Sequence, residues 1–233
     1  MKYLLTPIIF ILFFTAVSGQ RWTVLSEHTH FVRELGKEAV TVRDTYDGIE
    51  GSPFLNDDFV EGSLITRDSL MYQNVPLRYN IFKDEMEFLV DSGSSPMIIG
   101  TPQNFLFFRI NDKTFSYLAY NDGNTPKRGY FEVMNQGECQ ILRRRHITYR
   151  DPEPERGYSP AQPASFVTRK DLFYVKTGGQ TAEEIKLRRR DILSVFDEKK
   201  DEVSGFVSEN NLSYRSADDL VKIAEFYNQL MNK

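Results

Sequence analysis

Cysteine, histidine and tryptophan are scarce in this chain, and their scarcity excludes several classes of protein. The 233 residues include three histidines, one tryptophan and one cysteine, Cys139. A single cysteine cannot form a disulfide within the chain, so a disulfide-stapled fold is excluded and a hydrophobic core must hold the protein together. We expect Cys139 to be a small buried residue of a strand rather than a reactive thiol.

Histidine is too rare to indicate a metal centre. His28 and His30 would lie on one side of a strand, where they would hold a transition metal only with a third ligand nearby. The other histidine, His146, lies far along the chain. The sequence also lacks a Gly-rich phosphate loop and the Gly-x-Ser-x-Gly motif of serine hydrolases. We therefore predict neither a metal site nor a cofactor.

Long apolar runs are absent except at the N-terminus, where residues 3–14 are almost entirely apolar. Lys2 supplies a positive start, and the small residues at 16–19 are typical of a cleavage site. This pattern predicts a secretory signal peptide over residues 1–19, with an uncleaved N-terminal anchor as the alternative. We therefore expect a periplasmic or extracellular protein whose mature chain has no transmembrane span.

Acidic side chains are in slight excess over basic ones, which gives a formal net charge of -4 at pH 7. An exported acidic chain is a poor candidate for nucleic-acid binding, so we predict no nucleic-acid partner. Two basic runs interrupt the pattern, one of them at residues 188–190. In the other, strand alternation places Arg143 and Arg145 on one face and Arg144 and His146 on the opposite face. We interpret this second run as a solvated edge strand rather than a phosphate site.

Aromatic residues are abundant, with 18 Phe and 12 Tyr in short runs separated by turn formers such as Asn-Asp and Asp-Gly. These runs predict short strands joined by hairpin turns. The predicted strands cover residues 59–64, 70–88, 105–110, 113–120, 129–134, 140–149 and 166–176, and a loop with four prolines covers 151–163. The pattern favours an α+β fold, mainly an antiparallel β meander (a curved sheet, sandwich or open barrel) with C-terminal helices.

Helical periodicity begins at Arg189 and is clearest in the last segment. Ser216 is a good N-cap, and Asp218 and Asp219 favour the first turn of a helix. One apolar stripe follows, formed by Leu220, Ile223, Ala224, Tyr227, Leu230 and Met231. We predict three parts: the signal peptide at residues 1–19, a β-rich domain at 20–187, and a helical segment at 188–233 packed on it.

The segment Asp91-Ser92-Gly93-Ser94 matches the active-site loop of aspartic proteases, with apolar residues on both sides. Such an enzyme needs two carboxylates about 3 Å apart that share one proton. The chain has no second loop of this kind, so a peptidase would have to be a homodimer that uses Asp91 from each copy. Six consecutive turn formers at residues 91–96 favour a hairpin turn instead.

A second candidate site is a polar and aromatic group within the strand predicted over residues 70–88. We name five of its members as candidate binding residues: Arg78, Tyr79, Asn80, Glu85 and Glu87. Polar residues that alternate with apolar ones form either the wet face of a half-buried sheet or a recognition site.

Several segments resemble a family of uncharacterised exported proteins from Bacteroidetes. They are residues 51–59, 74–82, 84–88 and 129–133, together with Phe226-Tyr227-Asn228. The resemblance covers most of the mature chain, and its most specific part is the Leu-Arg-Tyr-Asn run followed by Met-Glu-Phe. It implies secretion to the periplasm or beyond, and it brings no known activity or catalytic residues.

The leading hypothesis is an exported cell-envelope protein that binds or scaffolds another envelope protein or a small ligand and is not an enzyme. One alternative is the homodimeric aspartic peptidase. The other is a small-molecule or lipid carrier, in which the curved sheet encloses a cavity lined by aromatic side chains.

Overall fold

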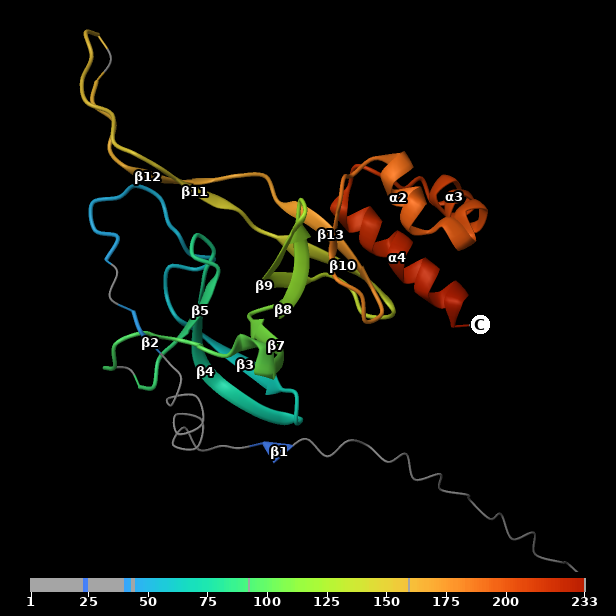
Figure 1. Ribbon diagram of the computed structural model, residues 1–233, viewed down its shortest axis with the longest axis horizontal. Coiled ribbons are helices and arrows are strands. Elements are labelled where there is room, and N and C mark those ends of the chain that lie inside the picture. Colours follow the sequence, from blue (N-terminus) through green and yellow to red (C-terminus); the bar gives the residue numbers. More distant parts are fainter. Residues whose placement is uncertain (1–22, 25–39, 43–44, 92, 159, 233) are drawn as a thin grey trace, which may run out of the picture.

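The computed structural model describes residues 23–24, 40–42, 45–91, 93–158 and 160–232 (Figure 1). The predicted signal peptide and the pair His28 and His30 lie outside the described residues. The main sheet is strongly curled, half-barrel-like and mostly antiparallel, and helices lie at one end of it. The predicted α+β class, with strands first and helices last, is confirmed.

Twelve strands of the described chain form the main sheet, in the spatial order β14-β13-β10-β9-β8-β7-β3-β4-β5-β6-β2, with β1 paired to β4 beside this path. Their bounds are Thr23–Val24 (β1), Val40–Thr41 (β2), Val60–Thr66 (β3), Leu70–Asn80 (β4), Glu85–Phe88 (β5), Met97–Ile98 (β6), Phe105–Ile110 (β7), Lys113–Asp122 (β8), Thr125–Val133 (β9), Cys139–Arg144 (β10), Leu172–Thr177 (β13) and Glu183–Ile185 (β14). Neighbours along the path are antiparallel, and β1 runs parallel to β4. Two meanders are thus joined side by side through β3 and β7.

Local turn chemistry builds the second meander where the sequence predicts it. Asn111 has a φ of 54° between β7 and β8, and Gly123 has a φ of 59° between β8 and β9. Both values lie in the left-handed region that Asn and Gly tolerate best. The hairpins from β7 to β9 are therefore confirmed, although β8 and β9 are longer than predicted.

One strand predicted from the sequence is divided in two by a turn. The strand expected over residues 70–88 is β4 followed by β5, and residues 81–84 turn the chain between them. Asp84 has a φ of 58°, which is uncommon for a residue other than glycine and marks a tight turn.

The strand predicted over residues 140–149 is also divided, because the chain leaves the main sheet after Arg144. The second part, β11 (Ile147–Arg150), pairs with β12 (Ser165–Thr168) in a separate two-stranded sheet. The first part, β10, lies between β9 and β13. The interpretation of residues 143–146 as an edge strand is therefore wrong.

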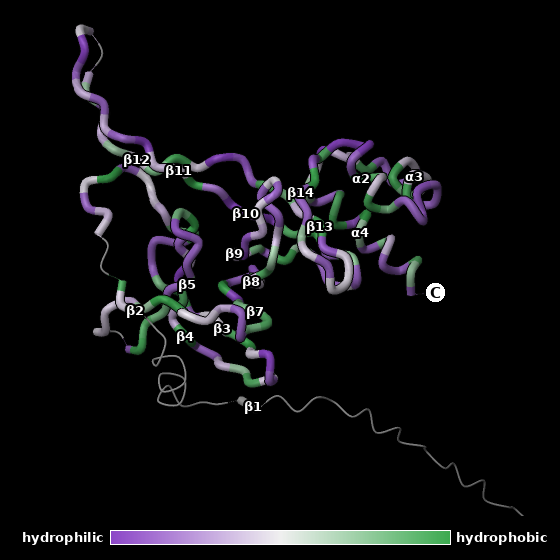
Figure 2. The backbone as a smooth tube through the Cα atoms, in the orientation of Figure 1, coloured by the Kyte–Doolittle hydropathy of each residue, from purple (hydrophilic) through white to green (hydrophobic). Residues whose placement is uncertain are grey.

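Two groups of buried side chains fill the sheet itself. The larger group lies around β3, β4, β5 and β7, and its rings contact one another with centroids 5.3–5.5 Å apart between Tyr79, Phe115, Tyr130 and Phe108. A smaller group contains Tyr120, Phe131, Leu142, Tyr174 and Ala182. Figure 2 shows the apolar stretches along these strands.

A third core joins the helices to the sheet. It packs α2 (Arg189–Val195), α3 (Lys200–Glu209) and α4 (Ala217–Met231) against β10, β13 and β14. Two short 3-10 helices complete the list of helical elements, at Pro102–Asn104 and Asp197–Lys199. The predicted N-cap is present, since the Ser216 hydroxyl accepts a hydrogen bond from the Asp219 N–H at 3.2 Å. None of the described helices is both long and apolar enough to cross a membrane.

The apolar stripe of α4 is buried along most of its length. Leu220, Ile223, Ala224 and Tyr227 are buried as predicted, whereas Leu230 is only half-buried and Met231 is 44% exposed.

Candidate functional site

Arg78 and Glu87, two of the predicted binding residues, form an ion pair across the β4–β5 hairpin. Glu87 Oε2 accepts from Arg78 Nε at 3.0 Å and from Nη2 at 2.7 Å. The Glu87 side chain is fully buried, and that of Arg78 is 17% exposed. The guanidinium carbon lies 3.8 Å from the ring centroid of Phe54 and 4.3 Å from that of Phe59, and Nη1 donates to the Asp57 carbonyl at 3.0 Å. The pair fastens the segment before β3 onto the hairpin.

Asn80 belongs to the same internal cluster. Its Nδ2 donates to the Tyr46 hydroxyl at 3.1 Å and to Glu87 Oε1 at 3.4 Å, and its Oδ1 accepts from the Lys83 N–H at 3.0 Å. Asn80 is 1% exposed. The polar atoms of this cluster therefore serve contacts within the protein. Of the five candidates, Glu85 is half-buried at the start of β5.

Tyr79, the remaining candidate, contacts a second set of polar groups at the tip of the same hairpin. Its hydroxyl donates to Asp84 Oδ1 at 2.7 Å, and that oxygen also accepts from the Tyr130 N–H at 3.2 Å. Asp84 Oδ2 accepts from Arg144 Nη2 at 2.9 Å. Gly129 makes room for the pair, because a Cβ there would lie 2.5 Å from Asp84 Oδ2. Burial and the neighbouring Asp84 carboxylate raise the pKa of Tyr79 well above its ordinary value, so its hydroxyl stays a donor.

The Asp84–Arg144 pair joins the two meanders of the sheet. Arg144 Nη1 also donates to the Tyr120 hydroxyl at 2.6 Å, and the guanidinium carbon lies 4.7 Å from that ring. Sequence reasoning did not pair these two residues, because 60 residues separate them. The alternation of the basic run did indicate that Arg144 would face away from Arg143 and Arg145, which is confirmed.

On the other face of β10, two arginines share one carboxylate. Glu132 accepts from Arg143 through Nε at 3.0 Å and through Nη2 at 2.5 Å, and from Arg145 Nη2 at 3.2 Å. Asp171 lies 3.9 Å from Arg143 Nε. These arginines therefore stabilise the junction of β9, β10 and β13 instead of facing solvent unpaired.

The Asp91 segment connects β5 and β6 as a hairpin loop, in agreement with its run of turn formers. Asp91 is exposed, and its Oδ1 accepts from the Gly93 N–H at 3.0 Å. The Ser94 hydroxyl accepts from the Val90 N–H at 3.0 Å and donates to the Asp91 carbonyl at 2.9 Å. Ser92, the fourth residue of the candidate catalytic set, lies outside the described residues. The described side chains of the loop thus contact the loop's own backbone.

The β11–β12 sheet forms an arm that projects from the body of the molecule (Figure 1). We define the arm as residues 147–168, of which Ser159 is outside the described residues. Its two strands pair from Ile147↔Thr168 to Arg150↔Ser165, and Glu153 and Gln162 then exchange two hydrogen bonds of 2.8 Å. The predicted proline-rich loop is therefore the outer part of a long hairpin.

Aromatic side chains anchor the base of the arm. The Phe166 ring is buried and lies 5.2 Å from Tyr46, 5.2 Å from Phe82 and 5.8 Å from Tyr149, measured between ring centroids. The Glu50 carbonyl accepts from the Phe166 N–H at 2.8 Å, and the Glu50 N–H donates to the Ala164 carbonyl at 2.9 Å. These contacts attach the base of the arm to the body of the molecule.

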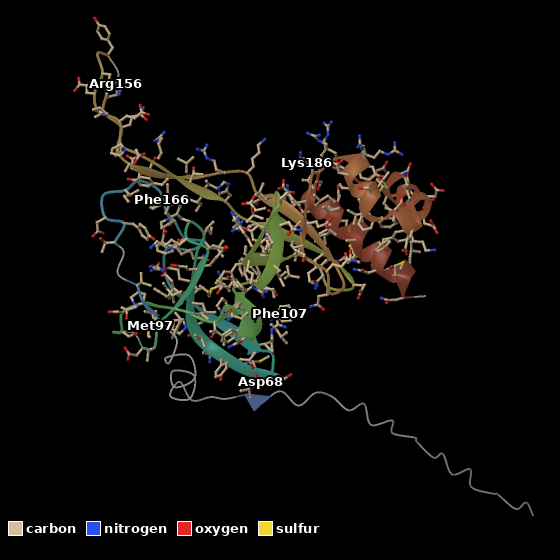
Figure 3. All side chains as sticks on the ribbon, viewed as in Figure 1. Asp68, Met97, Phe107, Arg156, Phe166 and Lys186 are labelled. Carbon is tan, nitrogen blue, oxygen red and sulfur yellow. The ribbon has the colours of Figure 1, made fainter. Side chains whose placement is uncertain are left out.

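Beyond its base the arm is exposed on all sides. The described residues from Asp151 to Tyr158 and from Pro160 to Pro163 are all exposed, and Tyr158 is fully exposed at the tip. Figure 3 shows Arg156 near this end, far from Asp68 at the opposite side of the molecule. Sequence reasoning located the segment but treated it as a loop.

A metal site, a reactive thiol and similarity to known proteins add little to the assignment of a function. Within the described ranges, no three His, Cys, Asp or Glu side chains are grouped so that they could hold a metal ion. Burial raises the pKa of the Cys139 thiol to about 11, which keeps it protonated and unreactive at neutral pH. Comparisons with protein-family models, curated proteins and solved structures find no match to this chain.

Proposed function

We propose that this protein is an exported binding or scaffolding module of the cell envelope that engages a protein partner through its arm. The observation that carries the proposal is the arm itself, which is anchored by ring contacts at Phe166 and exposes all described side chains of its outer part. A hairpin that buries so little of its own surface must still lose conformational entropy when it orders. Such a segment is most often maintained for recognition.

The composition of the arm suits recognition of another protein. Four prolines restrict its backbone, which lowers the entropy lost on binding. Tyr158 offers a large ring and a hydroxyl at the tip, and tyrosine is enriched where proteins bind one another. Acidic residues and Arg156 flank it with charges of both signs. We therefore favour a protein partner over a small ligand.

The candidate polar residues of the β4–β5 hairpin have a structural role, which leaves recognition to the arm. Asn80 and Glu87 are almost completely buried and already hydrogen-bonded, so they hold the hairpin and the arm's base in place. Rings also fill the region between β4 and β7–β9, where a carrier would need space for its ligand.

Export is part of the proposal and rests on residues 1–19. The apolar run after Lys2 and the small residues before Gln20 favour removal of this segment during secretion. The mass of the mature protein purified from its host would test this directly. A chain that begins at Gly19 or Gln20 supports export, and an intact N-terminus in the cytoplasm contradicts it.

Site-specific crosslinking would test the role of the arm. A photoreactive phenylalanine analogue is placed at Tyr158 and, as the control, at Asp68, which is also exposed but lies across the molecule. Both variants are expressed in the native host and irradiated. We expect a covalent adduct of one defined mass from position 158 and none from position 68.

A second variant tests whether the prolines of the arm contribute to binding, in addition to the presence of the arm. Replacement of Pro160 and Pro163 by serine keeps the β11–β12 pairing and should weaken the adduct, because the freed backbone loses more entropy on binding. Unchanged melting temperatures would show that the fold is intact. Equal adducts from positions 158 and 68, or none from either, would contradict the proposal.

A further inference from the structure

Four arginines of the helical layer have no carboxylate partner among the residues that the structure describes. Arg188, Arg189 and Arg190 lie at the start of α2, and Arg215 lies just before α4. All four side chains are exposed, and none forms an ion pair with any residue that the structure describes. Arg189 makes only a long contact, 3.5 Å from Nη2 to the Ser204 hydroxyl.

The partly buried arginines of the sheet behave differently, whereas the exposed Arg109 and Arg128 of β7 and β9 also lack an ion pair among the described residues. Arg78, Arg143, Arg144 and Arg145 each lie within 3.2 Å of a carboxylate oxygen. In this acidic protein, carboxylates are available, and arginines with a structural role are paired with them. What distinguishes Arg188, Arg189 and Arg215 from other exposed arginines is that they lie together around one hollow, where neighbouring like charges repel and destabilise the folded chain.

Three of these arginines line one hollow between the helices. Arg188 and Arg189 form one side, and Arg215 closes the other, with Leu212, Ser213 and Tyr214 between them. The hollow has a volume of about 560 Å³, within the size range of small-molecule sites. Figure 3 shows nitrogen-tipped side chains along this part of the molecule near Lys186.

The α3–α4 connection that carries Arg215 is held in a defined shape. Asn211 has a φ of 52°, the Ser213 N–H donates to Asp219 Oδ2 at 3.0 Å, and the Arg215 N–H donates to the Ser213 hydroxyl at 3.2 Å. Asp219 also accepts from Lys222 at 3.0 Å, so its charge is already balanced. Asp219, which contacts the connection, is therefore paired with Lys222 and not with these arginines.

We propose that this hollow binds the phosphate group of a small organic phosphate. Guanidinium groups present several N–H donors in a planar fork, which matches the oxygens of a phosphate better than a single ammonium does. Half-buried Leu212 and Tyr214 offer an apolar wall beside the charges, where the organic part of the ligand lies. The hollow is on the helical layer, away from the arm, so this site is independent of the partner-binding role (Figure 1).

Thermal unfolding with defined probes would test the site. The probes are inorganic phosphate and adenosine monophosphate, each compared with sodium chloride at the same ionic strength. A ligand that binds only the folded state raises the ratio of folded to unfolded protein about 100-fold at 100 times its Kd, and the melting temperature rises with it. We expect a larger rise with adenosine monophosphate than with phosphate alone. No rise above the chloride control with either probe would overturn the proposal.

Matched variants locate the effect. In R188Q/R189Q/R215Q the affinity should fall at least about tenfold, because each lost charged hydrogen bond weakens binding. The control R150Q/R156Q/K170Q removes the same charge from exposed residues in or beside the arm and should bind as the wild type does. Equal melting shifts in both variants would show non-specific ion binding and would also overturn the proposal.

Vesicles distinguish the source of the phosphate. Sedimentation with phosphatidylglycerol vesicles, and not with phosphatidylcholine vesicles, would identify a lipid headgroup as the ligand if R188Q/R189Q/R215Q abolishes it. Binding of adenosine monophosphate without vesicle binding identifies a soluble ligand. Vesicle binding that the pocket variant retains, without any phosphate binding, would contradict the site.

Discussion

The buried carboxylates Glu87 and Glu132 each form ion pairs with one or two arginines. Glu87 is fully buried against Arg78, and Glu132 is shared by Arg143 and Arg145. A charge removed from water costs several kcal/mol unless a partner and hydrogen bonds compensate it. Each set also joins two neighbouring strands, β4 with β5 and β9 with β10, so a change at one residue affects contacts on both strands.

Glu87→Gln should destabilise the protein by about 3 kcal/mol. The substitution keeps the shape of the side chain but leaves the Arg78 guanidinium, packed between two rings, without its counter-charge. Urea unfolding measures the free-energy change. Glu61→Gln, at an exposed position of β3, is the control and should change it by less than about 0.5 kcal/mol. Equal effects at the two positions would contradict a structural role for the buried pair.

Gly129→Ala and Gly205→Ala should have opposite effects on stability. A Cβ at Gly129 would lie 2.5 Å from Asp84 Oδ2 and 3.3 Å from Arg144 Nη2, so the ion pair must move. We expect a loss of about 1–3 kcal/mol. Gly205 lies within α3 with open space around its Cα, so alanine there should add up to about 1 kcal/mol by its helix propensity. Thermal unfolding of both variants tests the contrast; a loss at both positions would contradict it.

At the scale of elements, local sequence signals predicted some strands and helices correctly and missed other features. The hairpins from β7 to β9 follow from Asn111 and Gly123, and α4 follows from its Ser216 cap and apolar stripe. The break between β4 and β5 was missed because Asp84 takes up its left-handed conformation while bound to Arg144, far along the chain. Such long-range pairing leaves no mark in a local pattern.

Long-range contacts also explain what the sequence showed of the candidate sites. It marked Arg78, Asn80 and Glu87 as an unusually dense polar group, which they are. It did not show that their partners are Tyr46 and the Asp57 carbonyl, because those come from a segment without regular structure. Residues 151–163, the outer part of the arm, were predicted as a loop because their prolines obscured the pairing of Glu153 with Gln162.

Asn228 on α4 should be the most sensitive polar residue of that helix. Its Oδ1 accepts from the Cys139 N–H at 2.8 Å, and its Nδ2 donates to the Cys139 carbonyl at 2.9 Å and to the Gln136 carbonyl at 3.1 Å. Asn228→Leu leaves the Cys139 N–H without its partner, at a cost of about 1–3 kcal/mol, while both carbonyls still accept from Asn135 Nδ2. Gln229→Leu, at the next and exposed position, is the control and should be nearly neutral. Urea unfolding would show whether the two differ.

Asp91→Asn should be nearly neutral for stability, within about 0.5 kcal/mol. An amide oxygen can still accept from the Gly93 N–H, and the side chain is exposed. The same variant tests the peptidase alternative, because a proton-sharing pair of carboxylates cannot work with an amide. We expect no peptide cleavage by wild type or variant in acidic buffer. Cleavage by a wild-type dimer that is lost in the variant would contradict our reading of the loop.

At the scale of the whole molecule, buried acidic groups set an upper pH limit for the fold. Burial raises the pKa of Cys139 to about 11 and that of Tyr174 to about 12, and it raises the pKa of Tyr79 and Tyr130 well above the ordinary value. The unfolded chain therefore loses these protons first as the pH rises. Their contribution to stability is complete below the unfolded pKa values and is lost as the pH rises through the folded ones.

The free energy of unfolding should therefore fall steadily above about pH 9. Cys139 alone accounts for about 3 kcal/mol of this fall. Urea unfolding at several alkaline pH values measures it, and absorbance near 295 nm would show a set of tyrosines that ionise only as the protein unfolds. A constant free energy of unfolding from neutral pH to about pH 11 would contradict the burial of these groups.

The arm gives the molecule a natural break point. Before the arm the chain completes β10, and after it the chain supplies β13, which pairs with β10 over six residues from Cys139↔Thr177 to Arg144↔Leu172. The helices that follow pack on the same strand, so both halves of the chain build one core. A protease nick beside Arg156 would therefore leave two fragments that stay associated. The exposed tip is equally the place where the chain tolerates a fused label or an inserted domain.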